Sequence, residues 1–222
     1  MLKRATDILM AGALLLLLLP VLALCALGVW AADGRPILFS QDRVGRGGGV
    51  FRILKFRSMR PSDGPRVTSA GDLRVTRFGR VLRRWKLDEL PQLWNVLTGD
   101  MSMVGPRPEV PYYVDRNARA FAGISHLRPG ITDWASLVFR DEERLLAVHG
   151  GDAHFYERVL LPRKLALARL YGRRRSWIVD GRILAATVLI LGGASRLGQL
   201  VAGRQLFRHA RANLEPTVER FR

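Results

Sequence analysis

Two adjacent carboxylates, Asp88 and Glu89, follow a basic segment and precede Arg107, an arginine held between two prolines. Asp88 falls where a helix would start, because Pro91 is tolerated in a first helical turn and not further inside. One interpretation is structural: Asp88 caps the helix and Glu89 stabilises its first turn. The other is chemical, because a helix start would depress the pKa of Asp88 and keep it ionised as a nucleophile while Glu89 holds a cation. Magnesium is the natural cation for oxygen ligands that act on phosphates.

The composition indicates an anionic partner. The 222 residues include 36 Lys and Arg against 19 Asp and Glu, which gives a formal net charge of +17. Nucleic acid, anionic lipid and phosphate-bearing small molecules all fit that charge. The single cysteine, Cys25, excludes an internal disulfide and a multi-cysteine metal site, and the four histidines form no zinc-type pair.

Two other classes of protein also have to be considered beside an enzyme that acts on phosphates. A membrane-tethered basic protein that binds nucleic acid or scaffolds partners would explain the charge, but the sequence carries no nucleic-acid motif and does not interleave aromatic with basic residues. A membrane enzyme of another phosphoryl class would need a Walker or kinase glycine–lysine motif, which the sequence lacks. The charge is therefore the only support for the first alternative, and the second lacks its motif.

An apolar run near the N-terminus predicts a membrane segment. Residues 8–32 carry no charge, and about 20 apolar residues suffice to span a bilayer. A cleaved signal peptide has a shorter apolar region, of about 7–15 residues. Pro20 interrupts the run and would break a helix. Positive charge flanks both ends, which leaves a simple crossing without an orientation. Spanning and re-entrant helices both remain open on these residues alone.

The remaining sequence predicts an α+β fold that is mostly helical. Short β-prone pieces at 37–39 and 50–54 surround a glycine-rich turn and predict a hairpin. Residues 61–72 are typical of a loop. Apolar periodicity predicts helices in four further segments: 73–85, 88–99, 141–147 and 154–171. The apolar run 183–195 is too short to cross a membrane and indicates an interfacial or packed helix. We expect one compact unit on a membrane anchor.

Five ordered blocks resemble the bacterial sugar transferases, the monotopic phosphoglycosyl transferases that start cell-surface glycan assembly. The central block is "LDELPQLWNVLTGDMSMVGPRP". The other four are "KRATDIL" with the Pro-broken helix, "ILFSQDRVGRGGGVFRILKFRSM", "LRPGITDWASL" and "SWIVDGRILAAT". Five blocks in order along nearly the whole chain form a specific match, and the chain resembles the minimal catalytic unit of that family.

The resemblance implies a two-step reaction. Asp88 would attack the diphosphate of a UDP-sugar, expel UMP and carry a phosphosugar–aspartyl intermediate. A polyprenyl phosphate, such as undecaprenyl phosphate, would then take the phosphosugar. Glu89, with Asp88, would bind Mg²⁺. Repulsion between an aspartate and a diphosphate has to be neutralised, and the excess of arginine around Asp88 answers that need.

Further positions carry over from the family less firmly. Arg107 matches an arginine that handles the nucleotide or phosphate, and Arg140 matches another, although Arg140 could instead pair with Asp141 or Glu142. Three more positions match functional positions whose individual roles stay open: Lys55, Arg83 and Asp180. Asp133 and the segment 139–141 depart from many relatives, so the identity of the sugar is not fixed by the sequence.

The family's anchor is a re-entrant helix, and Leu19-Pro20 matches its break. The resemblance thus implies residues 1–34 as a re-entrant anchor broken at Pro20, and 35–222 as a catalytic domain lying on the membrane interface with several amphipathic helices. We expect the cytoplasmic face of a bacterial inner membrane, with membrane lipids but no nucleic acid as partners. A homo-oligomer and downstream glycosyltransferases are possible further partners.

Overall fold

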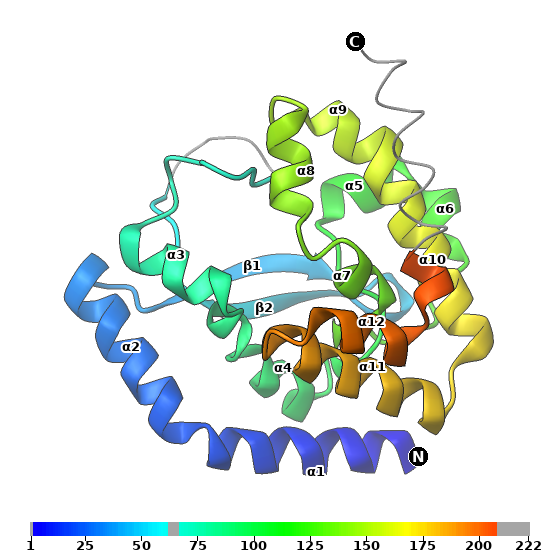
Figure 1. The fold of residues 1–222 in the computed structure, drawn as a ribbon, viewed down its shortest axis with the longest axis horizontal. Helices are drawn as coiled ribbons and strands as arrows, with labels where there is room; N and C mark the ends of the chain where they lie inside the picture. The colour runs from blue at the N-terminus through cyan, green and yellow to red at the C-terminus, as the bar shows by residue number, and fades with distance from the viewer. Residues whose placement is uncertain (1, 62–66, 208–222) are drawn as a thin grey trace.

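The computed structural model describes residues 2–61 and 67–207, so part of the predicted loop 61–72 lies outside the described residues. Two N-terminal helices, α1 (Leu2–Leu17) and α2 (Leu19–Asp33), form an L along one side of the molecule (Figure 1). The angle between them is 63°. Pro20 lies in the first turn of α2, where its missing N–H costs no hydrogen bond. The predicted break at Leu19-Pro20 is therefore confirmed, one residue later than the observed break at Leu18.

A helix that crosses a bilayer needs about 20 consecutive, mostly apolar residues. Within the described part of the chain, no helix by itself is long and apolar enough to cross; α1 and α2 meet the requirement only when taken together, across their bend. α1 packs against α4 (Gln92–Thr98) and α2 against α3 (Arg77–Arg84).

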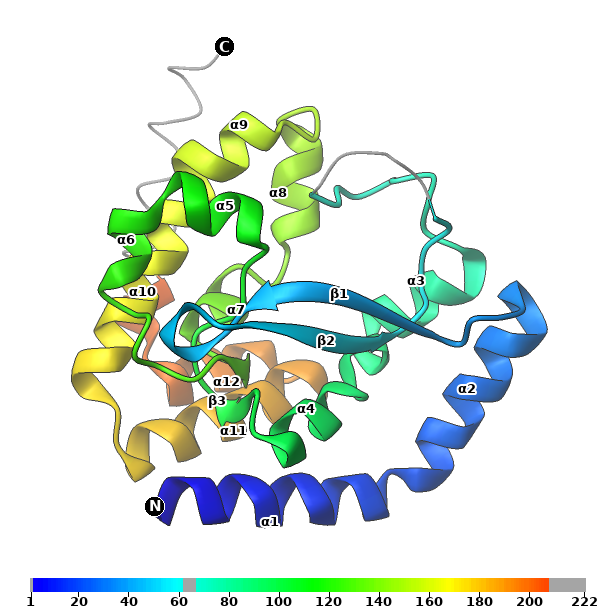
Figure 2. The same ribbon diagram turned by 180° about the vertical axis from the view of Figure 1, so that it is seen from behind.

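A long β-hairpin crosses the face that Figure 2 turns to the viewer. Its strands, β1 (Leu38–Val44) and β2 (Val50–Phe56), pair antiparallel from Leu38 opposite Phe56 to Val44 opposite Val50. The hairpin is confirmed, and its first strand is longer than the predicted 37–39. Gly47 and Gly48 in the turn have φ of 73° and 84°, which non-glycine residues rarely adopt.

The segment that carries the two acids folds into three short pieces. Thr76 begins α3 by accepting a 2.9 Å hydrogen bond from the Gly79 amide. A single 3₁₀ turn, η2 (Leu87–Glu89), follows Lys86, whose φ is 56°. α4 then ends at Gly99, which has φ 103°. The predicted helix 88–99 is therefore split, and the predicted helix 73–85 is shorter than expected.

The rest of the chain forms the larger part of the core. The parallel strands β3 (Ser102–Val104) and β4 (Gly130–Thr132) were not predicted. The remaining helices are α5 (Pro111–Arg116), α6 (Ala118–Ala122), α7 (Trp134–Val138), α8 (Glu142–Val148), α9 (Ala153–Phe155), the π-helical turn η3 (Tyr156–Leu160), α10 (Leu161–Arg174), α11 (Trp177–Leu191) and α12 (Ser195–Ala202). The predicted α+β, mostly helical fold is confirmed.

Polar contacts fasten both ends of the helix pair to this core. At the start of α1, Asp7 is buried and accepts hydrogen bonds from the Ser102 hydroxyl at 2.8 Å and the Met103 amide at 3.1 Å. Arg4 donates to the carbonyls of Val96 and Leu97, at the C-terminal end of α4. The macrodipole of α4 favours a cation there.

The far end of α2 is held by different residues. The Thr76 hydroxyl donates to Asp33 at 2.8 Å. Arg57 donates to the backbone carbonyls of Asp33, Gly34 and Arg35. Both ends of the helix pair are thus hydrogen-bonded to the rest of the protein.

Candidate active site

The two acids lie at the bottom of a buried turn. The left-handed conformation of Lys86 turns the chain after α3, and the single turn η2 places Asp88 and Glu89 inside the protein. Asp88 is 4% exposed and Glu89 9%. Neither η2 nor α4 receives a capping hydrogen bond from a side chain. The structural interpretation of Asp88 as a helix cap is therefore wrong.

Glu89 is held by two cations. Lys55, on β2, donates to its Oε1 at 2.9 Å. Arg107 makes a two-pronged contact, with Nη1 3.2 Å from Oε2 and Nη2 bonded to Oε1. Burial acts to raise the pKa of Glu89, but the charges of Arg107 and Lys55 outweigh it and hold that pKa well below its ordinary value. Glu89 is thus a fixed anion.

Asp88 has the opposite environment. Its Oδ1 is buried and has no hydrogen-bond partner. Burial and the neighbouring charge of Glu89 raise the pKa of Asp88 above its ordinary value, against the opposing charges of Lys55 and Arg83. The expected depression of this pKa is wrong, because burial and the charge of Glu89 outweigh the nearby cations. A basic carboxylate without partners is a better nucleophile than one tied into ion pairs.

Both acids line a cavity of about 720 Å³. Four more of the predicted residues line it as well: Lys55, Arg83, Arg107 and Arg140. Arg83 bonds to Glu143, and the Nη1 of Arg140 donates to the Ile190 carbonyl at 2.7 Å. We call six lining residues the Asp88 cluster: Lys55, Arg83, Lys86, Asp88, Glu89 and Arg107. Four cations and two carboxylates leave this cluster with excess positive charge.

One predicted residue lies elsewhere. Asp180, near the start of α11, is not among the residues that line the cavity. It accepts hydrogen bonds from Lys3 of α1 and from the Tyr171 hydroxyl, the latter at 2.7 Å. Tyr171 also donates to the carbonyl of Val104, three residues before Arg107. Asp180 thus joins the N-terminal helix to the strand that leads into the site.

The same cavity has an apolar region. Leu14 and Leu18, at the bend between α1 and α2, line it together with Ile190 and Leu191 at the end of α11. Further apolar lining residues come from β1, η2 and α4: Leu38, Phe39, Leu90 and Leu93. One cavity thus joins a charged cluster of acids and cations to the apolar elbow of the N-terminal helices.

Comparison with known proteins agrees with this geometry. The family model described as Bacterial sugar transferase matches residues 1–193. The chain belongs to the bacterial sugar transferase family. The resemblance read from the five sequence blocks is confirmed.

Three relatives illustrate the range of this sugar transferase family. The UDP-N-acetylgalactosamine–undecaprenyl-phosphate N-acetylgalactosaminephosphotransferase of Aeromonas hydrophila is 44% identical over 142 residues, which are 61% of this chain and 34% of the relative. The UDP-glucose:undecaprenyl-phosphate glucose-1-phosphate transferase of Escherichia coli (strain K12) is 43% identical over 143 residues, 62% of this chain and 31% of the relative. An uncharacterised sugar transferase of Bacillus subtilis (strain 168) is 35% identical over 214 residues, 91% of this chain and 95% of the relative. The match spans about a third of the length of the first two relatives.

Sequence reasoning missed a second polar group in the cavity of this sugar transferase. We call it the Lys164 cluster, after five lining residues: Arg43, Glu109, Glu142, Tyr156 and Lys164. They come from β1, the loop before α5, α8, η3 and α10. No motif unites residues so far apart in sequence; only Arg43 falls inside a block that carried the family resemblance.

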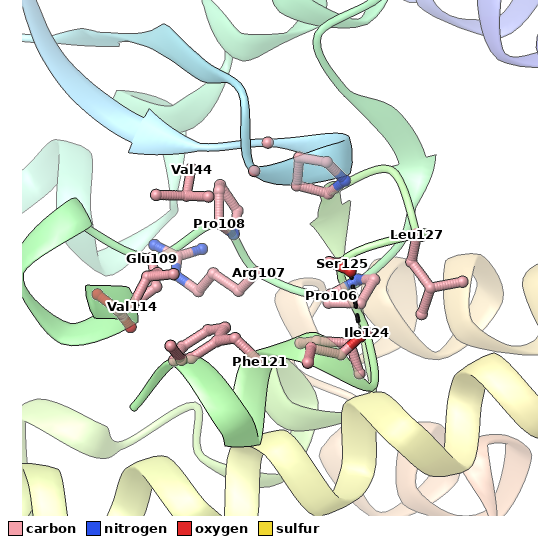
Figure 3. Close-up of a pocket in the computed structure, with 15 residues that line it drawn as sticks. Val44, Pro106, Arg107, Pro108, Glu109, Val114, Phe121, Ile124, Ser125 and Leu127 are labelled. Carbon is pink, nitrogen blue, oxygen red and sulfur yellow. Dashed lines mark hydrogen bonds between the residues drawn. The ribbon is translucent and has the colours of Figure 1, made fainter. Parts of the chain in front are cut away.

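A smaller pocket of about 170 Å³ lies behind the Pro-Arg-Pro corner. Figure 3 shows Arg107 running between Val44 and Pro108 on one side and Phe121 on the other. The lining of this pocket is mostly apolar, so the pocket walls support the aliphatic stem of Arg107 while its guanidinium reaches Glu89. Packing on both sides fixes the arginine that the sequence placed between two prolines.

Asp88 and Glu89 are also the residues that the sequence predicts to bind magnesium. Among residues 2–61 and 67–207, no group of three or more His, Cys, Asp or Glu side chains is placed to hold a metal. Magnesium does not require one, because it is commonly held by one or two carboxylates together with substrate phosphates. The unpartnered Oδ1 of Asp88, next to the Glu89 carboxylate, is a donor set of that kind.

Proposed function

We propose that this sugar transferase moves a sugar-1-phosphate from a UDP-sugar to a polyprenyl phosphate such as undecaprenyl phosphate, with release of UMP. The relatives from Aeromonas hydrophila and Escherichia coli act on undecaprenyl phosphate and a UDP-sugar, as their names state. One observation carries the proposal: a single cavity holds the cation-rich Asp88 cluster and the apolar elbow at Leu14 and Leu18. A soluble diphosphate and a lipid phosphate can use such a cavity in turn.

The reaction follows from the difference between the two acids. In the first step an oxygen of Asp88 attacks the phosphorus that bears the sugar, the bond to the UMP oxygen breaks, and UMP leaves with that electron pair. In the second step a phosphate oxygen of the polyprenyl phosphate attacks the same phosphorus, and the Asp88 carboxylate is released. Asp88 suits this role because its Oδ1 is unpartnered, whereas Glu89 is committed to Lys55 and Arg107.

The cations of the Asp88 cluster stabilise the charge that develops on the transferred phosphoryl group. Lys55 and Arg107 face Glu89, and Arg83 raises the local positive charge beside Asp88. Asp88 and Glu89 would hold Mg²⁺ together with the substrate phosphates, and the ion would neutralise phosphate charge. Arg140 lines the cavity near the end of α11, where we place it at the phosphate of the acceptor.

We also propose that α1 and α2 form a re-entrant anchor, residues 1–34, in the cytoplasmic membrane of a bacterium, with the catalytic part on its cytoplasmic face. Both ends of the pair bond to one body, through Asp7 and Asp33. Large apolar side chains are exposed along the pair, including Leu16, Leu17 and Leu24. Further exposed apolar residues lie on nearby helices: Trp85, Trp94, Trp177, Val188, Leu197 and Leu200. Aromatic residues of this kind favour a membrane interface.

The activity is tested with purified protein in liposomes that contain undecaprenyl phosphate, with Mg²⁺ and a panel of UDP-sugars. We expect UMP release from at least one donor and its loss in Asp88→Asn, with the protein still folded and membrane-bound. Asp115→Asn, an exposed position on α5, is the matched control and should keep full activity. Full activity of Asp88→Asn would remove Asp88 from its role. Salt-sensitive DNA binding that ignores Asp88 would support the alternative of a nucleic-acid-binding protein.

The topology is tested separately. Tags at residue 1 and at residue 40 should both be accessible from the cytoplasmic side in intact cells. Tags on opposite sides would show that the pair crosses the bilayer, and would contradict the re-entrant anchor without affecting the proposed chemistry.

A further inference from the structure

The Lys164 cluster is a connected chain of hydrogen bonds on the surface of the cavity. Lys164 Nζ lies 3.1 Å from the Tyr156 hydroxyl and 3.1 Å from Glu142 Oε2. The Tyr156 hydroxyl donates to Glu109. Arg43 lies 3.5 Å from Glu109, which ends the chain. The side chains of Lys164 and Glu109 are each 11% exposed, so the cluster is held in a fixed geometry rather than solvated.

A local irregularity of the backbone builds this chain. Tyr156 and Lys164 are eight residues apart, and on a regular α-helix such residues point about 80° away from each other. The π-helical turn η3 (Tyr156–Leu160) turns less per residue and brings both side chains to one face. π-turns inside α-helices are uncommon and occur frequently at functional sites. The segment thus departs from regular α-helix geometry, and this departure allows Lys164 to bond to Tyr156.

The charges of the cluster are balanced, in contrast to those of the Asp88 cluster. Lys164 is paired with Glu142 and Arg43 with Glu109. Burial acts to lower the pKa of Lys164, but Glu142, Tyr156 and Glu109 outweigh it and keep the ammonium charged, while burial raises the pKa of Tyr156 and keeps its hydroxyl a donor. The cluster therefore offers carboxylate acceptors beside hydroxyl and ammonium donors. A phosphate, which only accepts hydrogen bonds and is negative, would meet two carboxylates here.

The two clusters are neighbours. Arg43 of the Lys164 cluster donates to the Pro108 carbonyl at 3.1 Å, and Pro108 lies between Arg107 of one cluster and Glu109 of the other. Both clusters line the same cavity. A group bonded to the phosphorus at Asp88 would thus lie within reach of the Lys164 cluster.

We propose that the Lys164 cluster is the subsite that reads the hydroxyl groups of the donor's hexose, and that it selects a neutral sugar over a uronic acid. This rests on the proposed function. A hexose hydroxyl is both donor and acceptor, which matches the mixed groups of the cluster. A sugar carboxylate would face Glu109 and Glu142, while both cations of the cluster are already paired. Tyr156, Lys164 and Glu142 are therefore specificity-determining residues.

The test compares donors rather than overall activity. Protein in liposomes with undecaprenyl phosphate and Mg²⁺ is given UDP-glucose, UDP-galactose, UDP-N-acetylglucosamine, UDP-N-acetylgalactosamine and UDP-glucuronic acid, and kcat/KM is measured by UMP release. We expect the wild type to prefer a neutral donor over UDP-glucuronic acid by at least about 100-fold, because the sugar carboxylate would be buried beside Glu109 and Glu142, whose cations are already paired. Preference for the uronic acid would overturn the proposal. No release from any donor would instead reject the proposed function.

Two variants probe the cluster directly. Tyr156→Phe removes one hydroxyl and Glu142→Gln one charge, and each should change the ratio of kcat/KM between the two best neutral donors by about tenfold or more. Glu157→Gln, the next residue along η3, pairs with Arg116 outside the cavity and should leave the ratio within about twofold. Variants that slow all donors by one factor show a purely structural cluster and overturn the proposal. Altered inhibition by UMP with unchanged donor ratios would place the cluster at the ribose, and would also overturn it.

A measurement on the wild-type chain covers variants that fail to fold. Deoxy analogues of the best donor, each lacking one hexose hydroxyl, are compared with the parent sugar. At least one deletion should lower kcat/KM by about tenfold or more, because the buried partner of that hydroxyl is left unsatisfied. Equal turnover of all deoxy donors would show that no hydroxyl is read, and the proposal would be wrong.

Discussion

The Asp88 cluster and the Lys164 cluster share one cavity but balance their charges differently. In the Asp88 cluster, Lys55 and Arg107 both pair with Glu89, whereas within the described residues no ion pair reaches Asp88, so Glu89 is fixed as an anion and Asp88 is left with an unpartnered oxygen. In the Lys164 cluster, each cation has its own carboxylate. A buried charge without a partner is costly, and removing one partner of a buried pair is strongly destabilising. This difference underlies the two proposals above, which assign chemistry to the first cluster and recognition to the second.

The largest expected effect is on catalysis, at Arg107. Arg107→Ala removes the two-pronged contact to Glu89 and a cation at the phosphates, so kcat/KM for UMP release should fall by about 100- to 1,000-fold. Arg107→Lys should recover only part of the loss, because lysine cannot make the two-pronged contact. Arg116→Ala, on the exposed surface of α5, is the control and should leave the rate unchanged. A loss of less than about tenfold in Arg107→Ala would mean that the cluster does not depend on this cation.

The next effect concerns stability and compares the two clusters. Glu89→Gln leaves Lys55 and Arg107 buried without their shared anion, and should lower the free energy of unfolding by about 3 kcal/mol. Glu142→Gln leaves one cation, Lys164, which keeps Tyr156, and should cost about 1 kcal/mol. Denaturant unfolding in detergent micelles measures both.

The pH dependence of this difference has a definite sign. The pKa of Glu89 lies well below its ordinary value in the folded protein, so its contribution to stability is complete above the ordinary pKa of a glutamate and is lost as the pH falls toward the depressed value. The cost of Glu89→Gln should therefore shrink in acid. If Glu89→Gln lowers the free energy of unfolding by the same amount at every pH, Lys55 and Arg107 do not hold the pKa of Glu89 below its ordinary value.

The smallest effect is a gain in stability. The pKa of Asp88 is raised in the folded protein, so the wild type loses stability as the pH rises above the ordinary pKa of an aspartate. Asp88→Asn avoids that loss and, without Mg²⁺ or substrate, should be more stable at neutral pH by about 1 kcal/mol. Thermal unfolding at neutral and acid pH measures the gain, which should vanish in acid. A variant less stable than the wild type at neutral pH would contradict the raised pKa of Asp88.

The sequence predicted the parts of the site that depend on neighbours along the chain. Asp88, Glu89 and Arg107 lie within one block, and the break before Pro20 follows from the lost N–H of proline. The hairpin follows from two β-prone pieces around a glycine-rich turn. The sequence predicted the wrong direction for the pKa shift of Asp88, because that shift depends on burial and on the neighbouring charge of Glu89.

The other features could not be predicted, because they depend on contacts between residues far apart in the sequence. Strands of three residues, such as β3 and β4, are too short to show a hydrophobic periodicity. Their parallel pairing depends on close backbone contact, because a Cβ added to Gly105 would lie 2.3 Å from the carbonyl oxygen of Arg128. Lys3 and Arg4 were interpreted as charges that flank a membrane segment, yet they bond to Asp180 and to the end of α4. The Lys164 cluster was missed because its five members come from separate elements, and because Tyr156 and Lys164 share a face only through the π-turn η3.

If α1 and α2 form the proposed re-entrant anchor, their fastening at both ends sets how the protein sits on a bilayer. Asp7 and Asp33 bond the two helices to the rest of the protein, so the bend at Leu18 would enter the bilayer to a fixed depth. The opening of the cavity would then stand at a constant height above a single leaflet. Turnover should accordingly respond to headgroup packing in that leaflet and be indifferent to the total thickness of the bilayer.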